Sequence, residues 1–205
     1  QTCALPISTG IKYVRASDAS GTSWGSVVTV SSTTTDTEPS LAVVSGNPAI
    51  AYKGSSSIKY SYASDANGST WGSATTVVSG ATYLSPSLAV VSSNPAISYV
   101  AGSNLTYVRA SNTTGSSWGS AVTITTSSSN STGTSLVIVN GNPAIAYLNE
   151  VSSNYSQGFV RASAADGSTW NSAQTIDMGV ADGQYNSITL VNGNPAMSYY
   201  NYTSR

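Results

Sequence analysis

The stretch from residue 40 to residue 79, SLAVVSGNPAIAYKGSSSIKYSYASDANGSTWGSATTVVS, decides the fold, because the chain repeats it. Its tryptophan recurs at spacings of 47, 47 and 52 residues, as Trp24, Trp71, Trp118 and Trp170. Its Asn-Pro pair recurs in step, beginning at Asn47, Asn94, Asn142 and Asn194. Self-similarity at a period of this length indicates a solenoid, a propeller or another array of small units.

One unit contains four short runs of β-forming residues and no run with helical periodicity. The runs are SLAVV (40–44), PAIAY (48–52), IKYSYAS (58–64) and GSATTVV (72–78). Four antiparallel strands in a repeat of about 40 to 50 residues form one blade of a β-propeller. The sequence therefore predicts an all-β propeller of four-stranded antiparallel blades, whose strands we name A to D in chain order.

The strand count predicts one domain over residues 11–205, preceded by a non-repeating tail over residues 1–10. Residues 11–31 supply only strands C and D, and residues 187–200 supply only strands A and B. Three complete blades lie between them, over residues 40–78, 87–126 and 135–178. Two arrangements remain open: a ring of four blades closed by the two half-blades, or an open arc of a larger propeller.

The first seven residues, QTCALPI, match nothing in the repeats. They look like the translation of a sequencing adapter, so we expect a metagenomic fragment whose natural gene continues upstream. Cys3 is the only cysteine, which excludes an intrachain disulfide and leaves the redox compartment open.

The four loops that end in the tryptophans, called the tryptophan loops below, share further residues. A glycine stands three residues before each tryptophan, at Gly21, Gly68, Gly115 and Gly167, and the loops also carry Asp18, Asp65, Asn112 and Asp166. They resemble the Asp-box, or BNR, repeat of sialidase-type propellers, which reads roughly Ser-x-Asp-x-Gly-x-Thr-Trp. The likeness implies a structural rather than a catalytic role for these side chains. Asp18 and Asp65 lie three residues before the glycine instead of two, Asn112 replaces the acid, and Asp166 is adjacent to Gly167.

Composition excludes several classes of function. Only 7% of the residues are charged, the net charge is -1 and there is no histidine, so we expect no nucleic-acid partner, no cofactor and no metal site. No run approaches the roughly 18 to 20 apolar residues of a membrane helix, and we predict no membrane insertion.

Comparison of the repeats predicts which face carries a ligand. The A–B turns and tryptophan loops are nearly constant, whereas the B–C and D–A connections vary in length and sequence, which is typical of a binding face on a rigid scaffold. Tyrosine suits sugars because it offers a ring face and a hydroxyl. The candidates are four loop tyrosines, Tyr83, Tyr155, Tyr185 and Tyr200, and four at the end of strand B, Tyr52, Tyr99, Tyr147 and Tyr199. The alternative for the strand-B group is packing between blades.

Catalytic residues are not predicted. Arg15, Arg109 and Arg161 form a row, but near the tryptophan loops, where we expect them to stack on neighbouring aromatic rings. Glycosidase chemistry needs two carboxyls that face one substrate. The acids outside the tryptophan loops are scattered over different blades: Asp36, Glu38, Glu150, Asp177 and Asp182.

These observations favour a secreted or surface-attached module that binds neutral carbohydrate, or another surface partner, without turnover. A fragment of a sialidase-like glycoside hydrolase, and a structural or self-assembling surface protein, remain as alternatives. An extracellular or cell-surface location fits the Ser- and Thr-rich composition.

Overall fold

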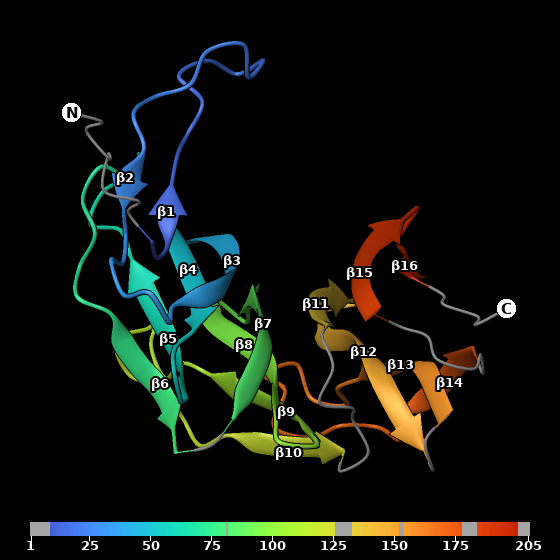
Figure 1. Cartoon of the computed structure of the whole chain (residues 1–205). Coiled ribbons are helices and arrows are strands. Elements are labelled where there is room, and N and C mark those ends of the chain that lie inside the picture. Colours follow the sequence, from blue (N-terminus) through green and yellow to red (C-terminus); the bar gives the residue numbers. More distant parts are fainter. Residues whose placement is uncertain (1–8, 81, 126–132, 152–153, 178–183, 201–205) are drawn as a thin grey trace, which may run out of the picture.

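The computed structural model describes residues 9–80, 82–125, 133–151, 154–177 and 184–200. These residues contain sixteen strands in five antiparallel sheets (Figure 1). The chain is an all-β propeller of antiparallel blades, as its repeats predict.

Three of the sheets are complete blades. The first is β3 (Thr37–Val44), β4 (Asn47–Lys53), β5 (Ser57–Tyr62) and β6 (Thr75–Ser79); the second is β7 (Tyr83–Val91), β8 (Asn94–Ala101), β9 (Asn104–Arg109) and β10 (Val122–Thr125); the third is β11 (Thr134–Val139), β12 (Asn142–Val151), β13 (Asn154–Arg161) and β14 (Gln174–Asp177). Each blade is a meander in which consecutive strands pair.

The other two sheets are half-blades at the two ends of the arc. β1 (Lys12–Tyr13) pairs with β2 (Val28–Thr29), and β15 (Gln184–Val191) pairs with β16 (Asn194–Tyr200). Within the described residues, no strand pairs with the outer side of β1 or of β16. Of the two predicted arrangements, the structure has the open arc, with the half-blades at opposite ends (Figure 1).

The A–B turns are tight, and both of their central residues have positive φ. The two central residues are Ser45 and Gly46 in the first complete blade, with φ of 46° and 86°, and Ser92 and Ser93 in the second, with φ of 45° and 68°. Two positive φ values are the mark of a type I′ turn, whose twist matches the flanking strands. The asparagine after the turn begins strand B, and its side chain reaches strand C, as Asn47 Nδ2 does with Ala63 O at 3.0 Å.

The core lies between neighbouring blades. Val44 and Ile58 of one blade share a buried cluster with Leu88, Ile97 and Val108 of the next. Burying side chains of this size stabilises a fold by about 1.5 to 3 kcal/mol each. Because each blade buries its apolar face against the next, contacts between blades stabilise the fold in addition to the strand pairing within each blade.

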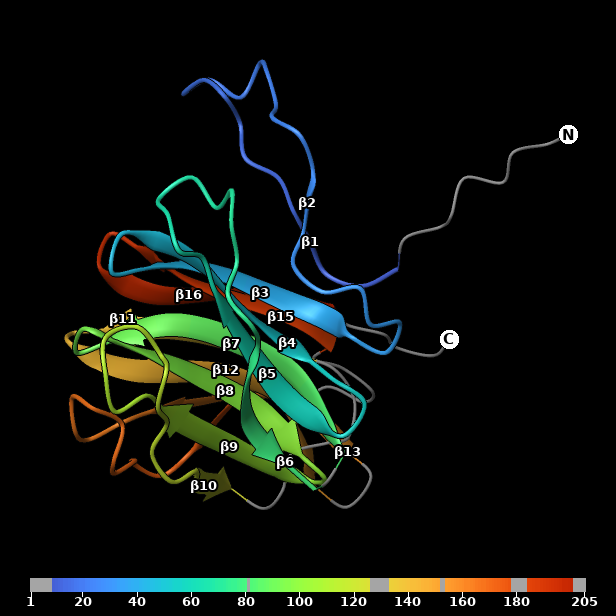
Figure 2. The ribbon, with the colours of Figure 1, turned by 90° about the vertical axis from the view of Figure 1, so that its left-hand side faces the viewer.

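The A strands of successive blades lie against one another (Figure 2). One serine in each A strand joins it to the following one. Leu88 N donates to Ser40 Oγ at 2.9 Å, Leu136 N to Ser87 Oγ at 3.0 Å, and Ile188 N to Ser135 Oγ at 3.1 Å. These bonds fix how each blade sits against its neighbour along the inner edge of the arc.

Candidate functional site

The constant loops of the chain interlock from blade to blade. Ser45 Oγ of one A–B turn donates to Thr113 O in the tryptophan loop of the next blade, at 2.9 Å. Ser92 Oγ repeats the contact with Ala165 O, also at 2.9 Å. We call the side with these loops the tryptophan-loop face, and the side with the B–C and D–A connections the variable face.

Asp65 organises its tryptophan loop through backbone amides. Its carboxylate accepts from Asn67 N at 2.9 Å, Ser69 N at 3.2 Å and Thr70 N at 2.9 Å. Asp18 accepts from the amides of Ser20, Thr22 and Ser23 in the same way. Each of these carboxylates therefore closes its loop through local hydrogen bonds to the backbone.

These hydrogen bonds lower the pKa of the loop carboxyls. The side-chain hydroxyl of Ser20 is the main cause at Asp18, and the backbone amide of Ser69 at Asp65. Asp166 takes a different position in its loop, but Ser168 Oγ and Ser168 N bond it and lower its pKa too. In the third copy the neutral Asn112 accepts from Ser116 N at 3.1 Å.

Each tryptophan of a complete blade is half-buried in the seam with the preceding blade. Its ring meets a strand-C tyrosine edge-on, with centroids 5.2 Å apart for Trp71 and Tyr13 and 5.3 Å for Trp170 and Tyr107. The loop glycine lies directly on the same tyrosine, since a Cβ on Gly167 would come 2.5 Å from Tyr107 Cε1. This position therefore needs glycine both for its φ of 77° and for space.

Two members of the arginine row, Arg109 and Arg161, make a different contact from the expected stacking. Arg109 Nε donates to Val91 O at 2.9 Å and Arg109 Nη2 to Ser92 O at 2.8 Å. Arg161 bonds the carbonyls of Val139 and Asn140 in its own blade in the same way. The guanidinium fits because it presents two donors in a fixed fork to two successive carbonyls at the end of strand A.

The starts of the A strands, on the variable face, have an unusual backbone. Corresponding positions in the four copies all have positive φ: Glu38 at 52°, Ser85 at 52°, Gly133 at 119° and Tyr185 at 58°. Register shifts mark bulges next to Glu38, Ser85 and Tyr185. Non-glycine residues rarely adopt this conformation, and clusters of them are typical of functional positions.

A chain of hydrogen bonds joins these four positions. Ser85 N donates to Glu38 Oε2 at 2.6 Å, and Gly133 N donates to Ser85 Oγ at 2.9 Å. Asn186 Nδ2, next to Tyr185, donates to Gly133 O at 2.6 Å. The bulged backbone thus becomes a continuous polar row across the inner edge of the arc, which we call the inner row.

The strand-B tyrosines are mostly core residues. Tyr52, Tyr99 and Tyr147 are each 1% exposed, so packing between blades, and not a ligand surface, describes them. Burial raises the pKa of Tyr147 to about 12. Tyr199, in the terminal half-blade, is half-buried and donates to Asp177 Oδ2 at 2.6 Å.

The loop tyrosines are more open. Tyr185 is 72% exposed and Tyr200 is 53% exposed, and Tyr200 lies opposite Gln184 at the same end of the β15–β16 hairpin. Tyr155 is half-buried opposite Glu150 in the neighbouring blade. Tyr83 begins β7, and its side chain lies outside the described residues. The exposed aromatic surface of the variable face is therefore concentrated toward the C-terminal end of the arc.

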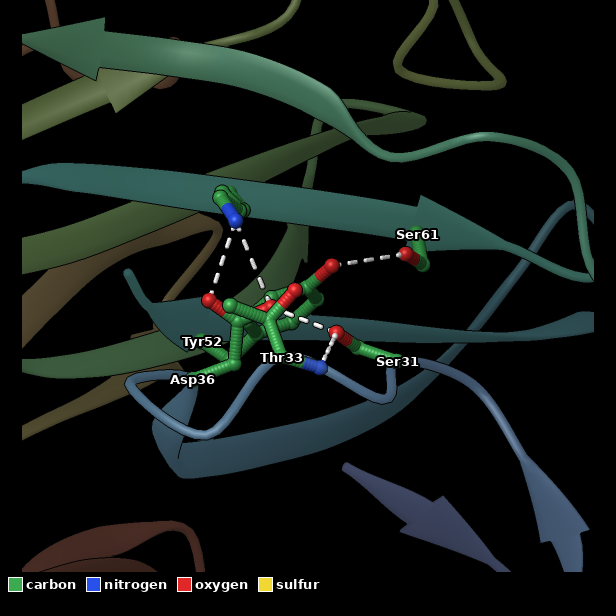
Figure 3. Close-up of polar contacts among 6 residues, drawn as sticks. Ser31, Thr33, Asp36, Tyr52 and Ser61 are labelled. Carbon is green, nitrogen blue, oxygen red and sulfur yellow. Dashed lines mark hydrogen bonds and ion pairs between the residues drawn. The ribbon is translucent and has the colours of Figure 1, made fainter. Parts of the chain in front are cut away.

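Asp36 is a buried carboxylate near the inner row, 3% exposed. Lys59 Nζ lies 2.9 Å from Asp36 Oδ1, and Ser31 Oγ donates to Asp36 Oδ2 at 2.6 Å (Figure 3). Tyr52 Oη and Ser61 Oγ, 3.3 Å apart, lie beside this network (Figure 3). Since both oxygens of Asp36 are occupied, the group braces the connection between β2 and β3.

Glu38 is the more accessible carboxylate. Its side chain is 36% exposed and pairs with Lys53 Nζ at 3.2 Å. The variable face thus offers hydroxyls, backbone groups and one accessible ion pair. In the described part of the chain, no group of three or more His, Cys, Asp or Glu residues is arranged to hold a metal ion. No helix in that part has the length and apolar character to cross a bilayer.

The inner row was missed by sequence reasoning. Its members, Glu38, Ser85, Gly133 and Tyr185, share a backbone conformation and no side-chain type, so no motif marks them. The only available signal was their distance of two residues before the repeated serines of the A strands, such as Ser40 and Ser87.

The chain resembles solved propeller structures. The NanB sialidase from Streptococcus pneumoniae, in complex with 2-[(3-chlorobenzyl)ammonio]ethanesulfonate, matches with a TM-score of 0.63 and 17% identity, over 90% of this chain and 31% of that one. A thermostable family-43 glycoside hydrolase matches with a TM-score of 0.55 and 14% identity, over 82% and 66%. The endo-arabinase from Bacteroides thetaiotaomicron matches with a TM-score of 0.54 and 14% identity, over 82% and 70%.

At these identities the likeness establishes the β-propeller fold. The chain spans about two thirds of the family-43 hydrolase and about one third of the sialidase. No protein-family model and no curated protein sequence matches the chain.

Proposed function

We propose that the variable face binds neutral carbohydrate without turning it over. The observation that carries the proposal is Tyr185, 72% exposed and held at positive φ, at the end of the inner row. A tyrosine ring stacks on the apolar face of a sugar, and the row beside it supplies hydroxyl and amide groups for the sugar hydroxyls. Tyr200 and Tyr155 extend the aromatic surface across two blades.

The charges of this face favour a neutral ligand. Lys53 is paired with Glu38, and Lys59 with Asp36, so these two lysines of the variable face already have carboxylate partners. A phosphate or sialic acid would have to compete with those carboxylates. We expect a dissociation constant per site on the order of 1 mM, with useful strength arising when several blades engage one repeating glycan. Such a role suits an extracellular or cell-surface protein.

Titration calorimetry with neutral oligosaccharides tests the proposal. Arabinan, xylan and galactan fragments are suitable probes, because the names of similar structures include an endo-arabinase, a xylanase and a galactanase. We expect the Tyr155→Ala/Tyr185→Ala variant to lose binding without a change in melting temperature. Tyr62→Ala is the matched control and should keep binding, because Tyr62 ends β5 beside Thr114 and Gly115 of a tryptophan loop, on the opposite face. Absence of binding by the parent to all three glycan classes would overturn the proposal.

Glycoside hydrolysis is the second candidate, favoured by the hydrolases among the similar structures and by the partly exposed Glu38. It needs a second carboxyl facing the same substrate. Asp36 is buried and ion-paired, and Asp18, Asp65 and Asp166 belong to the opposite face. The side chain of Glu150, and Asp182 as a whole, lie outside the described residues. Release of p-nitrophenol from aryl arabinosides or xylosides, abolished in Glu38→Gln, would establish hydrolysis in place of simple binding.

A further inference from the structure

Complete blades show how strand B joins strand C. In the second complete blade, Asn94 Nδ2 donates to Ala110 O at 2.8 Å, and Ala110 N donates to Pro95 O at 2.8 Å. Arg109 then ties strand C to the carbonyls of Val91 and Ser92 at the end of strand A. The third complete blade repeats every one of these bonds with Asn142, Pro143, Arg161 and Ala162.

The two half-blades contain the same residues, but separately. Arg15 and Ala16 follow β1, whereas Val191, Asn194 and Pro195 belong to β15 and β16. Arg15 and Asn194 are exposed, and within the described residues neither side chain makes the bonds of its counterparts. Each half-blade thus contains half of the residues that form these hydrogen bonds in the complete blades.

Exposed apolar side chains also lie at the two ends of the arc. Leu41 is 58% exposed, whereas its counterpart Leu88 is 6% exposed. Val191 is 53% exposed, and its counterpart Val91 is 1% exposed. Residues that are core inside the arc are surface at its ends, and apolar surface of this kind marks an interaction site.

The aromatic pair is divided as well. Trp24 is 62% exposed because no described blade precedes its own. Phe159 on β13 occupies the place of Tyr13, Tyr60 and Tyr107, which receive the tryptophan of the following blade. Phe159 is half-buried, and no tryptophan of the described residues covers it. A blade completed at the β16 edge would bring Trp24 onto Phe159.

We propose that the β16 edge of one copy pairs with the β1 edge of a second copy. The result is a composite four-stranded blade, β15–β16 of the first copy with β1–β2 of the second. The registers of the complete blades, in which Ala96 lies opposite Arg109 and Ala144 opposite Arg161, place Ala196 opposite Arg15 of the second copy. Arg15 then donates to the carbonyls of Val191 and Asn192, and Trp24 covers Phe159.

A second copy is the occupant because the half-blades of one chain lie at opposite ends of the arc (Figure 1). The seams between successive blades are already fixed by the serine hydrogen bonds and by the tryptophan–tyrosine pairs, so the arc does not bend to bring its two ends together. Pairing with a second copy leaves those seams unchanged. The contact is head to tail, so each copy keeps one unused edge and further copies add until a ring closes. This assembly does not depend on carbohydrate binding.

Two variants block the two edges separately. Arg15→Ala/Trp24→Ala removes the contacts of the β1 edge at exposed positions. Met197→Pro blocks the β16 edge. In the second complete blade the carbonyl of Pro95 points toward strand C, and by alternation the backbone N–H of Ile97, two residues on, points the same way. The backbone N–H of Met197, the counterpart of Ile97, therefore points to the open side of β16. A proline on an edge strand removes a donor that pairing requires and leaves β15 untouched. Asn194→Ala, exposed in the single chain, is a milder second variant for this edge.

Sedimentation velocity of the full chain over a wide concentration range, with reductant to exclude a Cys3 disulfide, measures the association. We expect mass to rise with concentration. Arg15→Ala/Trp24→Ala should weaken association by roughly a hundredfold, as loss of a central aromatic anchor does. Met197→Pro should weaken it by a similar factor, because proline removes a pairing donor and places its ring in the edge. Asn194→Ala should weaken it by roughly tenfold. Melting temperatures at low concentration should match the parent.

Mixing the two blocked variants is the decisive measurement. Each keeps one intact edge, so at a concentration at which each variant alone is monomeric the mixture should form a heterodimer and nothing larger. A parent that stays monomeric at every concentration, whether through open edges or through closure within one chain, overturns the proposal. A mixture without heterodimer, or variants that associate as strongly as the parent, also overturns it.

Discussion

Two tryptophan loops of similar sequence, one ending in Trp118 and the other in Trp24, differ in their surroundings. Trp118 meets Tyr60 with ring centroids 5.2 Å apart, whereas Trp24 is 62% exposed. Inside the loops the indole contact is the same, since each indole N–H donates to the glycine carbonyl three residues back, at 2.8 Å and 3.1 Å. The loop therefore forms from its own hydrogen bonds, and the neighbouring blade decides only whether its tryptophan contributes to the core.

The largest effect should come from the tryptophan itself. Trp118→Ala removes a ring that packs in the seam, and we expect a loss of about 3 kcal/mol in the free energy of unfolding. Trp24→Ala at low protein concentration should cost less than about 0.5 kcal/mol. Urea denaturation of both variants measures the difference. Equal losses would contradict the view that the seam, and not the loop, makes the tryptophan stabilising.

The loop glycines sharpen the same comparison. A Cβ on Gly115 would come 2.5 Å from Tyr60 Cε1, whereas nothing lies within 4 Å of a Cβ on Gly21. Both residues have positive φ, so both alanine variants carry the backbone penalty of about 1 kcal/mol. Gly115→Ala should cost about 1 to 3 kcal/mol more, because the tyrosine must move. Thermal melts of Gly115→Ala and Gly21→Ala measure the difference. Equal melting temperatures would show that Tyr60 moves away from the added Cβ at little cost.

The asparagines of strand B give a smaller contrast. Asn94 donates to Ala110 O and is half-buried, so Asn94→Ala should cost about 1 kcal/mol. Asn194→Ala should be neutral in the monomer, since Asn194 is exposed on the open edge. Chemical denaturation at low concentration compares them, and a loss at Asn194 as large as at Asn94 would indicate that the edge is already paired within one chain.

The smallest effect is the pH dependence of the loops themselves. The pKa of Asp65 is lowered from 3.8 in the folded chain, so its hydrogen bonds stabilise the fold above that pH and are lost as the pH falls below it. Asp65→Asn should melt with a weaker dependence on acid pH than the parent. Asp18→Asn should behave alike, because the loop bonds do not need a neighbouring blade. If the melting temperatures of both variants fell at acid pH as steeply as that of the parent, the loop carboxylates would not be the cause of the pH dependence.

The blades, their strand order and the tryptophan in the seam follow from a repeat that carries β-forming runs, turn residues and an aromatic at fixed spacing. The contact of Arg109 could not be predicted, because stacking on a ring and bonding to a turn both suit an arginine at that position. The burial of Tyr52, Tyr99 and Tyr147 was one of two alternatives, since a strand end lies equally near core and solvent.

The sequence by itself determined the local units: each blade, each I′ turn and each tryptophan loop forms from hydrogen bonds among residues close along the chain. Only the tertiary structure decided which copies of a repeated residue are core and which are surface, because a side chain in one blade is buried by the next. It alone also assembled the inner row, where Glu38, Ser85 and Tyr185 meet through backbone geometry. Contacts between distant segments depend on where the arc places them, which no local pattern encodes.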